Sequence, residues 1–335
     1  MSKFIGEDFM LENDAARELY HEHAARMPII DYHCHLQPVE IAENKEFEDL
    51  GEMWLRGDHY KWRCMRTFGI DEKYITGDAS YYEKYMKFAE ILPQLVGNPI
   101  YIWCALELKR YFDIDEPLTA ANAQEIYDRT KKLITEKHMT RRWCMEHSNV
   151  RLVSTTEDPI DDLRYHKVLN EEKMFTRVIT AFRPDKAINI NKPGFAEYMG
   201  KLAAVVGKEK LACIDCVTDA LTKRIEFFAE MGCRASDHGL DYIPYREATK
   251  EEVNAIYQKA MKGEAVTTEE AEKYQTYILI HLGKQYHRLG IVMQFHYNCL
   301  RGVNRKMNTL LGPDTGYDMI NTATCGGEIA ALLSA

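Results

Sequence analysis

The sequence predicts an α/β fold of the (β/α)₈ barrel type. Five apolar runs each end in a polar cluster, and segments with helical spacing separate them. Strands that alternate with helices form parallel sheets, and in a barrel the chemistry gathers where the strands end. A closed barrel needs eight strands. Because the sequence contains five predicted strands, we expect a barrel that is incomplete at the C-terminus.

The first elements are a helix and a strand. "NDAARELYHEHAARM" has helical spacing, with Asn13 or Asp14 as N-cap. "PIIDYHCH" follows as the first strand, because Pro28 opens it and the β-branched and aromatic residues favour extended backbone. Helix and strand together make a predicted N-terminal segment, residues 1–37.

A long helical insertion separates the first strand from the second. "PVEIAENKEFEDLGEMWL" and "TAANAQEIYDRTKKLITEKHM" carry apolar residues at helical spacing. We therefore predict a helical insertion or cap over residues 38–148. The barrel continues over residues 149–335, with strands expected within 150–159, 177–186, 231–240 and 290–298. The clearest helix there runs from Thr268 to about Leu289, with Thr267 and Glu270 as a capping box and Gly290 after its end.

Composition excludes several classes of function. Of 335 residues, 46% are hydrophobic and 28% charged, and the net charge of −9 without a basic block argues against nucleic acid as a partner. No apolar run approaches the ~20 residues of a membrane span, and the N-terminus lacks the apolar core of a signal peptide. Nine scattered cysteines favour free thiols in a reducing cytoplasm. Association into a homo-oligomer is left open.

One close cysteine pair stands out, Cys213 and Cys216 in "LACIDCVTD". A redox or zinc-binding CxxC is one interpretation, but no second CxxC completes a zinc site. Small buried side chains are the interpretation that we favour.

Two histidine pairs have the same spacing but different expected geometry. His21 and His23 fall on the predicted helix, where residues i and i+2 point about 200° apart, so they cannot readily share one ion. His33 and His35 fall on the predicted strand, where i and i+2 share a face. They are therefore candidate ligands of zinc or a similar divalent metal ion, although two buried, hydrogen-bonded histidines would show the same pattern.

Charged residues also follow the other predicted strands. Their signs are mixed, which suggests an anionic substrate beside a metal, and arginine can bind a carboxylate through two parallel hydrogen bonds. Structural ion pairs are the alternative for each of them. These residues are Arg183, Asp185, Asp237, His238, His296 and Arg301.

Longer motifs resemble the uronate isomerases (glucuronate isomerases) of the amidohydrolase superfamily. The motifs are "MPIIDYHCHL", "LRGDHYKWRCMR", "FRPDKA", "GCRASDHGLD" and "LRGVNRKMNTLLGPDTGYDMI", and the resemblance runs from about Phe4 to Gly327. It implies a (β/α)₈ barrel of amidohydrolase type. It also implies an enzyme that interconverts glucuronate with fructuronate and galacturonate with tagaturonate.

The resemblance also implies roles for particular residues. His33 and His35 would bind a divalent metal, often zinc. Tyr60, Asp237 and His296 would be catalytic, and Arg183 and Arg301 would bind substrate, with the adjacent His59 a weaker candidate. The family pattern continues beyond residue 335 with a metal-ligating aspartate, an arginine and a tryptophan.

Aldose–ketose isomerisation moves a proton between C2 and C1 through an enediolate. A metal can polarise the oxygen, a base must carry the proton, and a phenol such as that of Tyr60 can donate to the developing oxyanion. The residues do not identify the C2 base. Two other interpretations remain open at this point. One is a metal-dependent hydrolase of the same superfamily with His238 or His296 as a further ligand, and the other is an inactive fragment.

Overall fold

The computed structural model describes residues 4–335 and divides the chain into two compact units. Among the described residues, unit 1 consists of residues 4–29, 43–151 and 301–318, and unit 2 consists of residues 30–42, 152–300 and 319–335. Residues 1–3 of the predicted N-terminal segment lie outside the described residues. The predicted division at residues 37 and 148 stays a prediction.

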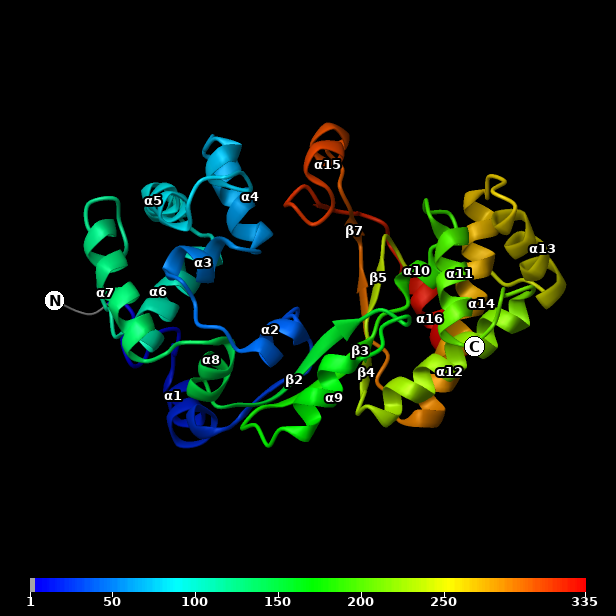
Figure 1. Ribbon diagram of the computed structural model, residues 1–335, viewed down its shortest axis with the longest axis horizontal. Coiled ribbons are helices and arrows are strands. Elements are labelled where there is room, and N and C mark those ends of the chain that lie inside the picture. The colour runs from blue at the N-terminus through cyan, green and yellow to red at the C-terminus, as the bar shows by residue number, and fades with distance from the viewer. Residues whose placement is uncertain (1–3) are drawn as a thin grey trace. The chain divides into compact units, whose positions relative to one another are not determined.

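Unit 1 is mainly helical, as expected for most of the insertion (Figure 1). Its N-terminal helix begins after Asn13, whose side chain accepts a hydrogen bond from the Ala16 amide. A π-helical turn, Leu19–His23, follows this helix, and there His21 Nε2 lies 2.8 Å from Asp8 Oδ1. A 3-10 turn, Ala24–Arg26, then precedes the first strand. The α-helices of unit 1 are α1 (Asp14–Glu18), α3 (Leu50–Leu55), α4 (His59–Thr67), α5 (Tyr81–Ile91), α6 (Pro99–Phe112), α7 (Ala123–Glu136), α8 (Arg141–His147) and α15 (Arg305–Leu311).

A parallel, curved sheet organises unit 2. The strand order β1-β2-β3-β4 follows the sequence, and β2 and β3 pair in parallel from Leu152↔Arg177 to Glu157↔Phe182. A separate parallel pair joins β5 to β6, and β7 and β8 pair antiparallel. The strands are β1 (Ile29–Asp31), β2 (Val150–Glu157), β3 (Arg177–Phe182), β4 (Ala235–Ser236), β5 (His238–Leu240), β6 (Phe295–Tyr297), β7 (Cys299–Leu300) and β8 (Met319–Ile320).

The described strands thus confirm an α/β fold with a parallel sheet, and a closed eight-stranded barrel stays a prediction. Each predicted strand region contains an observed strand. The first is shorter than predicted, because β1 ends at Asp31. Beyond it the backbone still follows β2, since Cys34 donates to Ser154 O at 2.9 Å and its carbonyl accepts from Thr156 Oγ1.

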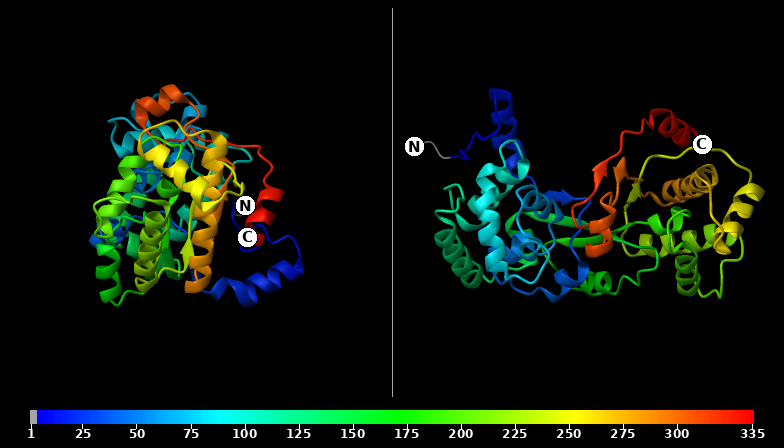
Figure 2. Two further views of the ribbon diagram at one scale, coloured as in Figure 1. Left: turned by 90° about the vertical axis from the view of Figure 1, so that its right-hand side faces the viewer. Right: turned by 90° about the horizontal axis from the view of Figure 1, so that it is seen from above.

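Helices of unit 2 bury the apolar face of this sheet. Helices α12 and α14 pack side by side, and α13 packs on both (Figures 1 and 2). The predicted signals of α14 are confirmed: its capping box joins Thr267 and Glu270, and Gly290 ends it at φ +67°. The α-helices are α2 (Pro38–Glu43), α9 (Arg164–Glu171), α10 (Asp185–Ile188), α11 (Phe195–Val205), α12 (Ile214–Glu230), α13 (Lys250–Met261), α14 (Thr268–Leu289) and α16 (Gly326–Ser334).

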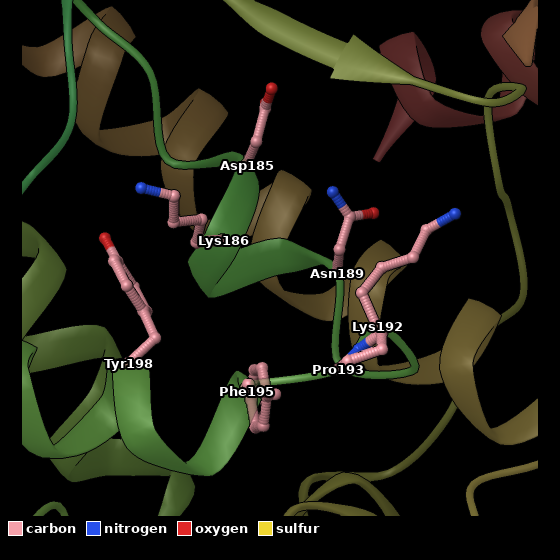
Figure 3. A pocket seen from close by; sticks show the side chains of 8 residues that line it. Asp185, Lys186, Asn189, Lys192, Pro193, Phe195 and Tyr198 are labelled. Atoms are coloured by element: carbon pink, nitrogen blue, oxygen red, sulfur yellow. The ribbon is translucent and has the colours of Figure 1, made fainter. Parts of the chain in front are cut away.

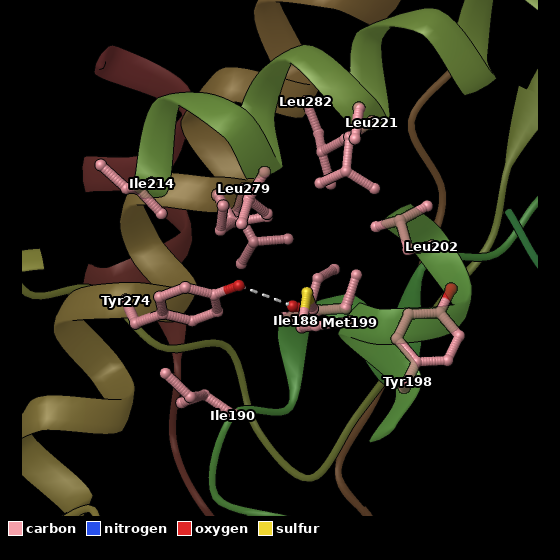
Figure 4. Close-up of a cluster of buried hydrophobic side chains, with 14 of the residues drawn as sticks. Ile188, Ile190, Tyr198, Met199, Leu202, Ile214, Leu221, Tyr274, Leu279 and Leu282 are labelled. Atoms are coloured by element: carbon pink, nitrogen blue, oxygen red, sulfur yellow. Dashed lines mark hydrogen bonds between the residues drawn. The ribbon is translucent and has the colours of Figure 1, made fainter. Parts of the chain in front are cut away.

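The core of unit 2 positions the segment that follows β3. Ile188 and Met199 pack with Leu279 and Leu282 of α14 in one buried cluster (Figure 4). The buried Tyr274 also belongs to it, and its hydroxyl donates to Ala187 O at 3.0 Å. A buried phenol needs such a partner, so the bond ties the short helix α10 to α14. This anchoring holds the polar end of β3 in place.

Candidate active site

Asp237 lies at the centre of a polar cluster in unit 2. It is fully buried between β4 and β5, where the chain changes its pairing from β3 to β6. Its amide donates to Phe182 O at 2.9 Å. Its carboxylate accepts a hydrogen bond from Arg183 Nη1 at 2.9 Å and lies 3.3 Å from Nε2 of His296. Three strand ends therefore meet at this carboxylate, as parallel topology predicts.

Arg183 is held by a second carboxylate. Its Nε donates to Asp185 Oδ2 at 2.8 Å, and Oδ1 of Asp185 accepts from the Gly239 amide at 2.9 Å. Burial raises the pKa of Asp185, and the neighbouring Arg183 charge opposes that rise. The guanidinium therefore joins two carboxylates, that of Asp185 at the start of α10 and that of Asp237 between β4 and β5.

The HxH histidines lie beside this cluster. The His33 ring is 4.5 Å from that of His296 and 5.0 Å from that of His35, which it meets edge-on at 87°. Donor atoms of His33, Asp237 and His296 all lie within 4.8 Å of one another. Burial lowers the pKa of His33 and of His35, which favours neutral imidazoles with a free lone pair.

These residues fit a divalent metal ion. His33 Nδ1 and Asp237 Oδ1 are buried and accept or donate no hydrogen bond in the described structure. A buried polar atom without a partner costs free energy, and a cation bound there would satisfy both atoms. Imidazole nitrogen with carboxylate oxygen is a donor set that zinc and similar ions accept.

His238 follows Asp237 directly but occupies a different environment. Neighbouring residues in extended backbone point to opposite faces. The His238 ring is fully buried, 5.4 Å from the ring of Phe295 and 5.7 Å from that of Tyr286. Burial lowers its pKa to about 3, so it is neutral at physiological pH. It packs as a core side chain.

The other predicted site residues belong to unit 1. His59 and Tyr60 open helix α4, capped by Asp58, and their rings lie 4.4 Å apart. The Tyr60 side chain is 64% exposed. Arg301 Nη1 pairs with Asp318 Oδ2 at 2.6 Å, and the carbonyl of Asp318 accepts from Arg63 Nη1 of α4 at 2.9 Å. The "RGDHYKW" and "LRGVNRK" motifs therefore lie together within this unit.

A hollow beside α10 adjoins the polar cluster through Asp185 (Figure 3). Its lysines are paired: Lys186 with Asp158 at 3.1 Å and Lys192 with Asp241 at 2.7 Å. The hollow contains neither the histidines nor Asp237.

Sequence reasoning named Asp185 as a strand-end residue but assigned it no role. The "FRPD" motif carries the signal, because an acid two residues after an arginine that follows a buried strand can reach its guanidinium. Gly239 was missed, because only the tertiary contact with Arg183 shows why no side chain fits there. A buried network of Glu157, Thr155 and His166 was also missed.

Comparisons with known proteins agree on one family. Residues 1–335 match the family model described as glucuronate isomerase. The uronate isomerase of Caldicellulosiruptor bescii is 51% identical over 334 residues, which cover 99% of this chain and 70% of that protein. The uronate isomerase of Lachnospira eligens is 47% identical over 336 residues, covering 100% and 72% respectively.

Solved structures give the same result. The uronate isomerase of Thermotoga maritima superposes with a TM-score of 0.94 at 34% identity, covering 99% of this chain and 73% of that one. The glucuronate isomerase of Caulobacter crescentus superposes with a TM-score of 0.90 at 26% identity, covering 98% and 71%.

Proposed function

This chain belongs to the glucuronate isomerase family, and on that premise we propose that it interconverts D-glucuronate with D-fructuronate and D-galacturonate with D-tagaturonate. The observation that carries the proposal is the family match over the whole chain. The alternative of a hydrolase in the same superfamily is not favoured by these relatives.

We propose that His33 and His35 hold a divalent metal ion, zinc in the first instance. Two imidazoles that share one tetrahedral zinc ion have ring centroids roughly 5 Å apart, because each Zn–N bond is about 2 Å long. The 5.0 Å separation of the two rings supports this ligand pair. When bound, such an ion supplies Lewis-acid polarisation of the substrate's carbonyl oxygen.

His296 is proposed to transfer the proton, and Asp237 is proposed to position His296. The His296 side chain is 42% exposed and can meet the sugar, whereas Asp237 is fully buried and acts through its neighbours. With its carboxylate 3.3 Å from Nε2, Asp237 is placed to orient the imidazole. His296 can then accept a proton from a sugar hydroxyl or carbon and return it.

Substrate recognition is proposed for four further residues, each taken here by itself. Arg183 donates to two carboxylates of its own protein, which supports a role in holding Asp237 beside the substrate. Arg301, half exposed, is the candidate for the hexuronate carboxylate. Tyr60 is proposed to donate to the developing oxyanion, with His59 beside it; both roles rest on their motif.

Location and membrane association are separate questions. Across residues 4–335, no helix combines the length and apolar character needed to cross a membrane. All nine cysteines are free thiols, which supports the proposal of a reducing cytoplasm.

The experiment is conversion of D-glucuronate by the purified chain in D₂O with zinc supplied, followed by NMR spectroscopy. Proton transfer by a side chain that exchanges with solvent places deuterium at C1 of D-fructuronate. D-galacturonate in a parallel reaction tests the second substrate. Ketose formed without any deuterium at C1 would contradict proton transfer by a side chain that exchanges with solvent, and the absence of ketose from both sugars would contradict the proposed activity.

A further inference from the structure

The cysteine pair Cys213 and Cys216 lies apart from the residues assigned to the isomerase reaction. The expectation of buried side chains holds only in part, because both cysteines are partly buried. Their sulfur atoms lie 3.0 Å apart, and both are free thiols. Two unbonded sulfurs at this separation are closer than ordinary van der Waals contact, so little movement is needed to join them.

A zinc-binding interpretation has no further ligands here. Within residues 4–335, the group of three or more metal-ligating side chains that converge is His33, Asp237 and His296. Among these described residues, Cys213 and Cys216 therefore have no additional ligands to complete a zinc site. The redox interpretation of the CxxC is the one that we pursue.

The backbone around Cys213 is fixed by helix α13. Tyr257 OH donates to Leu211 O at 2.7 Å, and Gln258 Nε2 donates to Ala212 O at 2.6 Å. On the other side of Cys213, the Ile214 amide donates to Asn254 Oδ1 at 2.9 Å. Three hydrogen bonds thus hold the residues that flank Cys213, so it stays opposite Cys216 without an ordering cost at the moment of reaction.

The two thiols differ in their expected reactivity. Cys213 is the N-cap of the 17-residue helix α12, and Cys216 lies in its first turn. The hydrogen bond with the Cys213 thiol, together with the backbone N–H groups of Cys213 and Ala212, lowers the pKa of Cys216, while the same pairing raises the pKa of Cys213. The positive end of the helix dipole favours a thiolate at this place. Cys216 is therefore the attacking thiol and Cys213 the resolving one.

We propose that Cys213 and Cys216 form a thiol–disulfide exchange site for small disulfides, distinct from the isomerase site. The Cys216 thiolate attacks one sulfur of a disulfide RSSR, forming Cys216–S–S–R and releasing RS⁻. Cys213 then loses its proton, and its sulfur attacks Sγ of Cys216, forming the internal disulfide and releasing a second RS⁻. The protein dithiol is oxidised by two electrons, and RSSR is reduced to two RSH, which take up the two protons.

The test is incubation of the full chain with glutathione disulfide, followed by blocking of free thiols, trypsin digestion and mass spectrometry. Cleavage after Lys210 and Lys223 isolates both cysteines in one peptide, residues 211–223, with no other cysteine. The expected product is this peptide lighter by two hydrogen atoms and unblocked. Recovery of the peptide with both thiols blocked, or with a separate glutathione on each, would overturn the proposal.

Single variants assign the two roles. Cys213→Ser should accumulate one glutathione on Cys216, because no resolving thiol remains. Cys216→Ser should react roughly tenfold more slowly, because the remaining thiol is the less acidic one; an equal or faster reaction would contradict the order of attack. Cys144→Ser is the matched control. Burial raises the pKa of Cys144 to about 12, so its removal should leave oxidation of peptide 211–223 unchanged.

Discussion

Gly239 and Arg183 approach each other so closely that a β-carbon on Gly239 would stand 2.7 Å from Nη2 of the arginine. The same β-carbon would stand 2.8 Å from Oδ2 of Asp185. Such distances are not tolerated by real side chains, so the guanidinium and its carboxylate partner occupy the space that a side chain at residue 239 would take. The glycine thereby permits the Arg183–Asp185 pair to sit directly over β5.

Gly239→Ala should displace the Arg183 guanidinium and weaken its hold on Asp237. We expect kcat/KM to fall by about tenfold or more, equivalent to at least about 1.4 kcal/mol of transition-state stabilisation. The measurement is steady-state kinetics on D-glucuronate. Gly200→Ala is the control. Gly200 is exposed on α11, and a β-carbon there would meet no atom from outside the local helix backbone within 4 Å, so the variant should keep full activity and gain roughly 0.5–1 kcal/mol of stability. Unchanged kcat/KM in Gly239→Ala would contradict the proposal that catalysis depends on the position of the Arg183 guanidinium.

Asp185→Asn should reduce kcat about tenfold while changing KM by less than about twofold. The amide keeps an oxygen for the Gly239 amide but loses the charge that holds Arg183 Nε. We propose that Asp185 acts by positioning Arg183, whose Nε donates to its carboxylate. Asp14→Asn, which removes the partner of Arg17 in an exposed ion pair, is the control and should change neither constant. A rise in KM alone would indicate that Asp185 binds substrate instead.

His33→Ala and His35→Ala should each lose bound zinc and most of the activity. His21→Ala and His23→Ala should retain both, because these histidines lie on a π-helical turn where His21 pairs with Asp8. Elemental analysis of the four dialysed variants is the readout. His296→Ala shows whether His296 is a zinc ligand or a proton carrier. If the variant retains zinc but loses activity, the result supports the proposed role of His296 in proton transfer. Zinc bound equally by all five variants would refute the site.

Glu157 should make stability depend on pH. It is 7% exposed, and burial raises its pKa from 4.5 to about 7, against hydrogen bonds from Thr180 and Thr155 that lower it. Because the folded pKa lies above the unfolded one, this contribution is fully present below about pH 4.5 and is lost as pH rises through about 7. The shift corresponds to about 3 kcal/mol.

His166, whose Nε2 lies 3.6 Å from Glu157 Oε2, has the opposite dependence. Burial lowers its pKa from 6.5 to about 4, so its contribution is present above about 6.5 and lost as pH falls through about 4. The contributions of Glu157 and His166 change in opposite directions with pH. The informative quantity is therefore the difference in free energy of unfolding between Glu157→Gln and the parent chain. The free energy of unfolding of the variant minus that of the parent should rise by about 3 kcal/mol as pH increases from about 4 to about 8, measured by urea unfolding. A difference that stays constant with pH would contradict the raised pKa.

The sequence by itself determined the local elements and the family. Helix α14 could be predicted to the residue, because its capping box and terminal glycine satisfy backbone groups within a few positions of the chain. The parallel order of the strands followed from their alternation with helices. The motifs around His33, Tyr60, Arg183, Asp237 and Arg301 indicated the uronate isomerases, and the comparisons confirmed that family.

Only the tertiary structure decided which charged side chains of the candidate site pair with one another. Spacing along the chain placed Arg183, Asp237 and His296 at strand ends, but it could not show that Arg183 joins two carboxylates or that Asp237 is fully buried. It also could not separate Asp237 from His238, which are neighbours in sequence and opposite in environment. The physical reason is that burial, pKa and hydrogen-bond partners depend on residues brought together by packing, 54 positions apart for Arg183 and Asp237, whereas caps and periodicity depend on residues within one turn.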